Sequence, residues 1–293
     1  MVARTLAAIA TDLRDVVRHF ELLGLPIGRG RIRSYLELID AAARGEHVER
    51  SLIWATACEV DDLVAAASLD PASLGPVRHR MAKLCAGDLV LTSKSRPDPG
   101  RDLCFELVTA AMLQKIGVQS KLESPSDAVN MVGGQALLVE CKRPTTFAAL
   151  GRRLKDGYRQ ISEHRRAGHV GVGAIAVEVS VLVNPGFDVL VAESQSRAID
   201  GLYGHIQRVF QEARIHLAEA ARNARRDAGV HLLMFRVKCM AGDGVETPYI
   251  TTVWHLEPVV SLASPEFSQL YNFMKNHSEF NLGIWAGLTR TRY

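Results

Sequence analysis

The chain has few cysteines, and none is placed as metal-binding or redox-active cysteines usually are. Five cysteines are spread over 293 residues, and no two of them form a C-x-x-C pair. Such pairs are typical of zinc sites and of thiol–disulfide exchange. We therefore expect neither chemistry. We expect reduced and mostly buried thiols at Cys58, Cys85, Cys104, Cys141 and Cys239.

The chain also lacks a long apolar run. Charged residues at positions 4, 12, 14 and 15 interrupt the N-terminus, which is not typical of a signal peptide. The most apolar segment, Val170 to Val183, contains Glu178 and is shorter than the roughly 20 residues that a membrane-spanning helix needs. We expect a cytoplasmic protein with no membrane partner.

A strong charge of one sign is absent as well. The net charge is +3, and charged residues make up 23% of the sequence. A balance this small does not by itself indicate a polyanionic partner, so that inference needs a local cluster of basic residues. Hydrophobic residues make up 47% of the chain, which is enough for one large core or two smaller ones.

The first part of the chain has apolar residues at helical spacing. Two helices are expected within residues 5–45, a third from about Ser51 to Ala67, and a short one from Val77 to Leu84. The stretch 93–101 is polar and contains two prolines, which is typical of a linker. We therefore predict a mainly helical domain over residues 1–92, a linker over 93–101 and a second domain over 102–293.

Helical and strand patterns alternate in the second region. A helix from Asp102 to Ile116 is expected to precede strands at 118–122, 127–132 and 136–142, with Gly133-Gly134 as a two-residue turn. A helix from Thr146 to Ala167 and a β-branched strand ending at Asn184-Pro185 follow. This order predicts an α/β fold with a mixed sheet flanked by helices. Later expected elements are a strand at 187–191, a helix at 197–228 and a strand at 232–240.

Three charged residues lie on two of the expected strands. Glu140 and Lys142 are two positions apart in an apolar strand, so they project from the same face. Such charges are costly to bury unless they pair, bind a metal or line a cleft. The two-residue turn pairs Val132 with Gln135, and counting back along both strands places Asp127 directly opposite Glu140.

Two facing carboxylates repel each other unless a cation lies between them. A hard divalent cation such as Mg²⁺ or Mn²⁺ accepts oxygen ligands, so Asp127 and Glu140 are candidate metal ligands, with the backbone carbonyl of Cys141 as a further one. The metal would polarise a phosphate and acidify a water. Lys142 would orient that water or offset the charge at phosphorus.

These residues resemble the motif of the PD-(D/E)xK nuclease superfamily. Asp127 is followed by a spacer of twelve residues and then by Glu140-Cys141-Lys142, and Ser126 stands where the motif often has proline. The resemblance implies a restriction-endonuclease-like core of the order αβββαβ, metal ligation by Asp127 and Glu140, and a catalytic lysine at Lys142. It covers about eighty residues, 106–183.

The resemblance adds two further candidates. The family often carries a glutamate on its first core helix, which implies a metal or water ligand at Glu106; a solvent-facing helix residue is the alternative. Some subfamilies carry Q-x-x-x-Y on the helix after the lysine strand, which implies a role for Gln160. Here His164 replaces that tyrosine, so the chain departs from the exonuclease-like branch.

The helix from Thr146 to Ala167 is basic. It carries six Lys or Arg residues against two acidic ones. Such a face would contact phosphates beside the cleavage site, although a solvated helix surface is the common alternative. The candidate DNA contacts are Arg152, Arg153, Lys155 and Arg159.

The leading hypothesis is an Mg²⁺- or Mn²⁺-dependent DNA nuclease, with endonuclease action favoured by the missing tyrosine. A second hypothesis is a catalytically silent nuclease-fold protein that binds nucleic acid or supports assembly. A third is a helical scaffold with an accidental E-x-K, which predicts that Asp127 and Glu140 lie far apart. Enzymes that cut both strands commonly act as homodimers, but no residue in this sequence specifies one.

Overall fold

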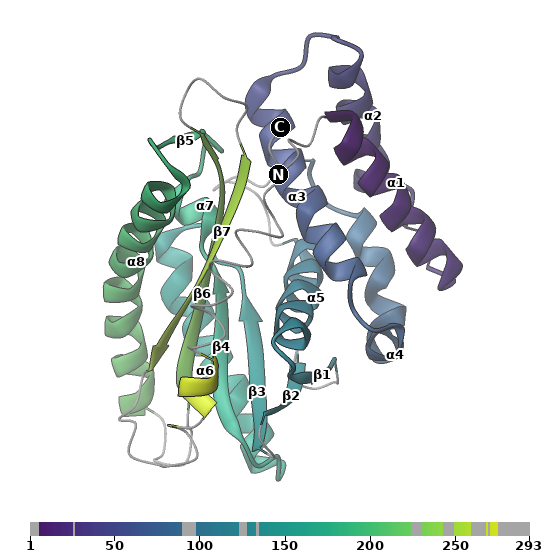
Figure 1. Ribbon diagram of the computed structural model, residues 1–293. Helices are drawn as coiled ribbons and strands as arrows, with labels where there is room; N and C mark the ends of the chain where they lie inside the picture. The colour runs from purple at the N-terminus through teal and green to yellow at the C-terminus, as the bar shows by residue number, and fades with distance from the viewer. Residues whose placement is uncertain are drawn as a thin grey trace.

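A mixed β-sheet with helices on both faces forms the centre of the computed structural model (Figure 1). The model describes residues 6–25, 27–89, 98–122, 128–132, 135–223, 230–242, 249–258, 268 and 270–274. Within these ranges the strands are β1 (Gln119–Lys121), β2 (Ala128–Val132), β3 (Gln135–Lys142), β4 (Val172–Glu178), β5 (Leu190–Val191), β6 (Val230–Gly242) and β7 (Tyr249–Pro258).

The strand order is β1-β2-β3-β4-β6-β5, and β7 also pairs with β6. Strands β3, β4 and β6 are parallel neighbours, whereas β1, β2 and β7 are attached by antiparallel pairing. Parallel strands need crossover connections, which α6 (Phe147–Arg166) and α8 (Gln195–Asn223) supply. The chain is therefore an α/β protein, as the alternating patterns predict.

The predicted order of helix, three strands, helix and strand is present. Helix α5 (Pro99–Lys115) precedes β1, β2 and β3, and α6 leads into β4. The predicted hairpin register is also present, because Val132 pairs with Gln135 and Ala128 pairs with Val139. Asp127, one position before Ala128, lies outside the described residues, so its place opposite Glu140 stays a prediction.

The predicted strand that ends at Asn184-Pro185 is wrong in its second half. Strand β4 ends at Glu178, and residues Ser180–Val183 form the short helix α7. The Glu178 carboxylate accepts hydrogen bonds from the backbone N–H and the hydroxyl of Ser180, and that hydroxyl accepts from the backbone N–H of Lys238. These polar contacts turn the chain out of the sheet although its apolar composition continues.

Two other elements differ from expectation. Of the strand predicted at 187–191, only Leu190 and Val191 pair in the sheet. Strand β7 was not among the predicted elements, yet it forms a long antiparallel pair with β6. Its sequence, YITTVWHLEP, is rich in the β-branched and aromatic residues that favour strands.

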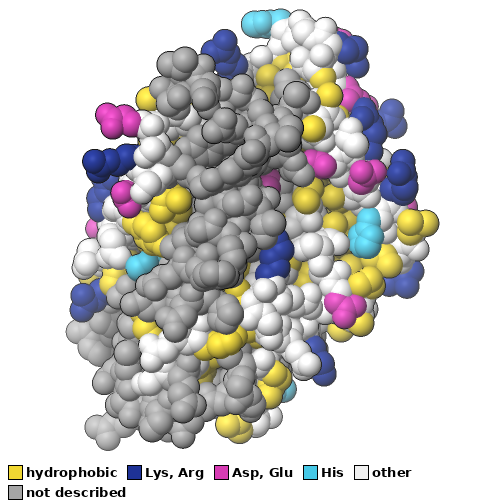
Figure 2. Space-filling view, viewed as in Figure 1, with side chains coloured by type: hydrophobic (Ala, Val, Ile, Leu, Met, Phe, Trp, Pro, Cys, Tyr) yellow, Lys and Arg dark blue, Asp and Glu magenta, His cyan; other side chains and the backbone are white. Residues whose placement is uncertain are grey.

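The N-terminal helices lie where their apolar spacing predicts. They are α1 (Leu6–Leu22), α2 (Arg31–Ala43), α3 (Arg50–Ala67) and the 3₁₀ helix η1 (Gly75–Cys85), which covers the short helix expected at 77–84. The short helix α4 (Pro71–Leu74) was not among the expected elements. An ion pair of 2.6 Å between Arg14 and Asp40 joins α1 to α2. Figure 2 shows acidic and basic side chains next to each other over these helices, as on a solvated surface.

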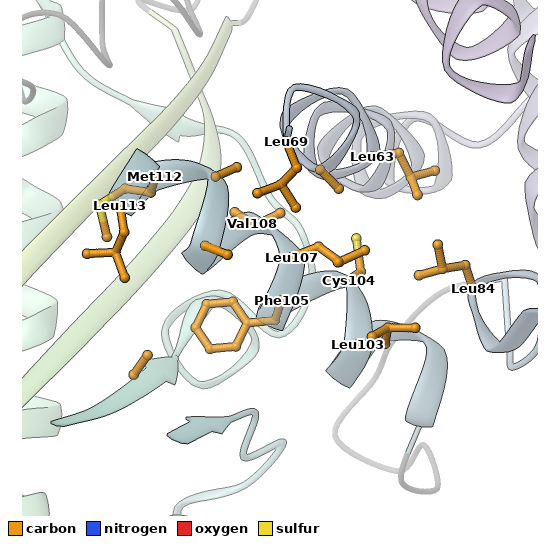
Figure 3. Packing of buried hydrophobic residues seen from close by; sticks show 14 of the residues in the cluster. Leu63, Leu69, Leu84, Leu103, Cys104, Phe105, Leu107, Val108, Met112 and Leu113 are labelled. Atoms are coloured by element: carbon orange, nitrogen blue, oxygen red, sulfur yellow. The ribbon is translucent and has the colours of Figure 1, made fainter. Parts of the chain in front are cut away.

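One face of the sheet packs against α5. The helix begins at Pro99 behind the N-cap Asp98, whose carboxylate accepts from the N–H groups of Gly100 and Arg101 at 3.0 Å. Its side chains contact both the sheet and the N-terminal helices (Figure 3), and one hydrophobic cluster contains residues from Ile9 to Met274. Thus core residues from both sides of 93–101 pack together, and the proposed division into two domains stays a prediction.

The opposite face packs against α6 and α8. Leu150, Leu154 and Ile161 of α6 are fully buried against Ile175 and Phe235 of the sheet. Helices α6 and α8 also pack against each other. The sheet thus lies between two helical layers, and α6 crosses the face of β3 that carries Glu140 and Lys142.

A set of buried charged side chains joins α3 to the sheet. Lys238 of β6 donates to Asp61 at 2.7 Å and also to Asp62, and Arg236 pairs with Asp62 and, at 2.9 Å, with Glu178. Burial alone would raise the pKa of Asp62, but the two cations hold it well below its usual range. All five side chains are largely buried, so each charge depends on its partners.

We expect Lys238→Met to destabilise the protein by about 3–5 kcal/mol, because it leaves two buried carboxylates with fewer cationic partners. Urea unfolding followed by circular dichroism measures the change. Arg33→Met is the matched control, since the Arg33–Glu37 pair is exposed and should change the unfolding free energy far less. Equal losses for both variants would contradict this account.

Candidate active site

Glu140 and Lys142 project from the same face of β3, as period-two geometry predicts. Leu137 and Val139 point into the core beneath α5. Because side chains alternate along a strand, Glu140 and Lys142 point to the other face, which α6 covers. The Glu140 side chain is 0% exposed and that of Lys142 is 8% exposed. The Lys142 ammonium donates to Oε2 of Glu140 at 2.9 Å, which pairs two charges that would otherwise be costly to bury.

His164 of α6 completes this buried cluster. Its Nε2 lies 3.0 Å from Oε1 of Glu140, and the ring is nearly as buried as the carboxylate. An ionised carboxylate only accepts hydrogen bonds, so Nε2 must carry the hydrogen. Glu140 therefore has one oxygen bound to an imidazole and the other to an ammonium.

Two oxygen atoms converge on the ammonium of Lys142. Besides its bond to Glu140, Nζ lies 3.2 Å from the backbone carbonyl of Cys141 and donates to it. Both oxygens belong to groups that the sequence nominates as metal ligands. Carboxylate and carbonyl oxygens are the donors that Mg²⁺ and Mn²⁺ prefer, so the chemical type of these two donor atoms suits such an ion.

The described residues do not supply a complete metal shell. Among them, no group of three or more His, Cys, Asp and Glu side chains is arranged to hold a metal ion. Asp127, the other predicted carboxylate ligand, lies outside these residues. Metal binding by Asp127 and Glu140 therefore stays a prediction.

Gly157 allows α6 to approach β3 closely. A Cβ atom at this position would lie 3.2 Å from Cε of Lys142 and 3.1 Å from Cδ1 of Ile175. Helical spacing places Arg153, Gly157, Gln160 and His164 along one stripe of α6. Gln160 is half-buried on this stripe, between the glycine that contacts Lys142 and the histidine that contacts Glu140.

Helix α5 contributes an acid that the sequence did not single out. Burial raises the pKa of the half-buried Asp102 above its usual value. The positive charges of Arg143, Arg153 and Lys142 act in the opposite direction, so the Asp102 carboxyl lies within electrostatic range of the site. Its place in the first turn of a helix, four residues before Glu106, is the signal that could have identified it.

Glu106, the acid that the resemblance nominates on α5, is buried. Its described ion pair is with Arg80 of η1, at 2.6 Å. The solvent-facing alternative considered for Glu106 is therefore wrong. A role as metal or water ligand stays a prediction.

The basic side chains of α6 divide between its two faces. Arg152, Lys155 and Arg159 are exposed, whereas Arg153 is half-buried on the stripe that faces the site. Arg159 also pairs with Glu163 at 2.8 Å in an exposed contact. The outer face of α6, on the opposite side of the helix from the buried cluster, therefore offers accessible positive charge.

Comparison with protein-family models, with curated proteins and with solved structures found no match. A function is therefore inferred from the chain's own residues. Among the described parts of the chain, no helix combines the length and apolarity needed to cross a membrane.

We expect Glu140 and Lys142 to be strongly coupled in a double-mutant cycle. Lys142→Met removes a cation from a fully buried carboxylate and should cost about 3–5 kcal/mol, part of which Glu140→Gln in the same chain should restore. Urea unfolding measures all four proteins. The exposed Arg159–Glu163 pair on α6 is the control cycle, and purely additive losses at Glu140 and Lys142 would disprove the coupling.

Proposed function

We propose that this protein is a metal-dependent DNA nuclease that hydrolyses phosphodiester bonds, acting as an endonuclease. The observation that carries the proposal is the convergence of Glu140 Oε2 and the Cys141 carbonyl on one cation, the Lys142 ammonium, at the end of a buried strand. Such hard oxygen donors suit Mg²⁺ or Mn²⁺. A lysine beside them suits the negative charge of a phosphate.

The described groups have separate roles in this proposal. Glu140 and the Cys141 carbonyl would hold the metal together with Asp127 and, in the family pattern, Glu106. A bound Mg²⁺ or Mn²⁺ polarises the scissile phosphate and lowers the pKa of a water. Lys142 donates hydrogen bonds to that water or to phosphate oxygens, and its charge offsets the negative charge that develops at phosphorus.

The order of elements also supports the proposal. Helix α5, strands β1–β3, helix α6 and strand β4 follow the αβββαβ order of the PD-(D/E)xK core that the motif resembles. Glu140 and Lys142 fall at the end of β3, and Gln160 falls on α6. His164 at the position of the exonuclease-like tyrosine favours endonuclease action.

DNA is the proposed substrate because exposed basic residues lie on the outer face of α6, the helix that covers the site. Arg152, Lys155 and Arg159 on the outer face of α6, with Arg153 nearer the site, would contact phosphates on either side of the cleaved bond. These contacts would position the duplex without selecting its sequence. A homodimer would suit cutting of both strands.

One observation favours the catalytically silent alternative. Glu140 is 0% exposed and both of its oxygens contact protein groups, so the cluster would serve as a satisfied structural network in a nucleic-acid-binding or assembly module. The nuclease and the silent module differ in whether the protein cleaves the DNA that it binds. A silent protein binds DNA and leaves it intact with either metal.

We expect the purified protein to nick supercoiled plasmid in the presence of Mg²⁺ or Mn²⁺. Nicking should stop when EDTA is added. Asp127→Ala, Glu140→Gln and Lys142→Ala should each lower the rate by at least about 100-fold, because each removes a group from the charged centre. Gel analysis of plasmid, linear duplex and single-stranded substrates measures cutting.

Lys83→Ala is the matched control for this assay, because it removes an exposed lysine of η1 without touching the site. It should cut as the wild type does. Circular dichroism must show that each variant is folded at the assay temperature. Cutting that survives EDTA or Lys142→Ala would refute the mechanism, and binding without cutting on every substrate would establish the silent alternative.

The double variant Arg152→Ala/Lys155→Ala should weaken DNA binding and make it less sensitive to salt. Loss of two phosphate contacts lowers the slope of log affinity against log salt by about 2. Fluorescence anisotropy of a labelled duplex, with Ca²⁺ in place of Mg²⁺, measures the slope. Arg18→Ala/Lys83→Ala removes the same charge from the N-terminal helices, and an equal change there would show that only net charge matters.

A further inference from the structure

We infer that His164 is a positioning residue that fixes the rotation of the Glu140 carboxylate, so that Oε2 and the Cys141 carbonyl face one cation site. The inference rests on the proposed function and assigns His164 a part in it. Its basis is the 3.0 Å contact between His164 Nε2 and Glu140 Oε1, made between two largely buried side chains from different elements.

The two oxygens of Glu140 have different partners. Oε1 accepts from the imidazole, and Oε2 accepts from Lys142, which also donates to the Cys141 carbonyl. Without the imidazole bond, the Glu140 carboxylate could rotate about its Cγ–Cδ bond and turn its plane away from the cation. The imidazole bond therefore holds the carboxylate plane so that one oxygen faces the position where the Lys142 ammonium now lies.

His164 is presented from a rigid part of α6. Ile161, three residues earlier, is fully buried in the core on this face of the sheet, and Ser162 donates to the backbone carbonyl of Tyr158 at 2.8 Å. Gly157, two turns earlier, keeps α6 close enough to β3 for the ring to reach Glu140. A ligand held by a group on a packed helix keeps its orientation when substrate arrives.

A purely structural role for His164 makes a different prediction. In that case the imidazole only satisfies a buried carboxylate, and its removal lowers stability without changing how the folded protein binds a metal ion. Metal affinity measured on folded protein therefore separates positioning from simple satisfaction of a buried charge.

The experiment is a titration of the full-length protein with Mn²⁺ by calorimetry, in the absence of DNA. His164→Leu fills the space but donates no hydrogen bond, and we expect it to weaken Mn²⁺ binding about 10–100-fold. His164→Gln places an amide nitrogen as many bonds from Cβ as Nε2 of histidine, so it should recover most of the affinity. His164→Asn is one bond shorter and should not.

His79→Ala is the matched control, because His79 is an exposed histidine of η1 and not of α6 or β3. It should bind Mn²⁺ as the wild type does. Unchanged affinity in folded His164→Leu would overturn the positioning role while leaving the proposed function intact. If that variant does not fold, equal affinities for the Gln and Asn variants overturn the role.

The two levels of the proposal fail in different ways. A wild-type protein that binds no Mn²⁺ and cuts no DNA overturns the proposed function, and the role of His164 falls with it. A wild-type protein that binds Mn²⁺ while all His164 variants bind equally well overturns only the role of His164. Weaker binding in the Leu and Asn variants with recovery in the Gln variant supports both levels.

Discussion

Buried charged side chains of the central strands are hydrogen-bonded or ion-paired to helices on both faces of the sheet. On the α6 side, Glu140 is bound by Lys142 and His164; on the α3 side, Arg236 and Lys238 are bound by acidic residues. Each charge is largely removed from water, so it needs a partner within the protein. The position of α6 over β3 is therefore fixed by the hydrogen bond between His164 and Glu140 as well as by apolar packing, and that of α3 over β6 by ion pairs as well as by apolar packing.

Much of this architecture could be predicted because its signals are local. Apolar spacing located α1, α2, α3, α5 and α6, and the Gly133-Gly134 turn set the register of β2 against β3 up to the pair Ala128–Val139. The end of β4 could not be predicted. It depends on contacts of Glu178 and Ser180 with each other and with a strand some sixty positions later, and no local pattern reports them.

The candidate site was predictable to a similar extent. Glu140 and Lys142 stood out because two charges interrupt an apolar strand, and β6 repeats that pattern with Arg236 and Lys238. The charge of Lys142 acts on the pKa of Asp102 because α5 packs against β3, and the local sequence does not indicate this packing. The contact of His164 with Glu140 spans 24 positions and depends on how closely α6 approaches the sheet. The place of Asp127 beside them stays a prediction.

The charges that join α3 to β6 also restrict movement. Asp61 and Asp62 lie on α3, and their cationic partners lie on the longest strand of the sheet. Sliding the helix along the strand would separate opposite charges in a medium that screens them poorly. Helix α3 is therefore held in register with β6, and α1 and α2, which pack against α3, are held with it.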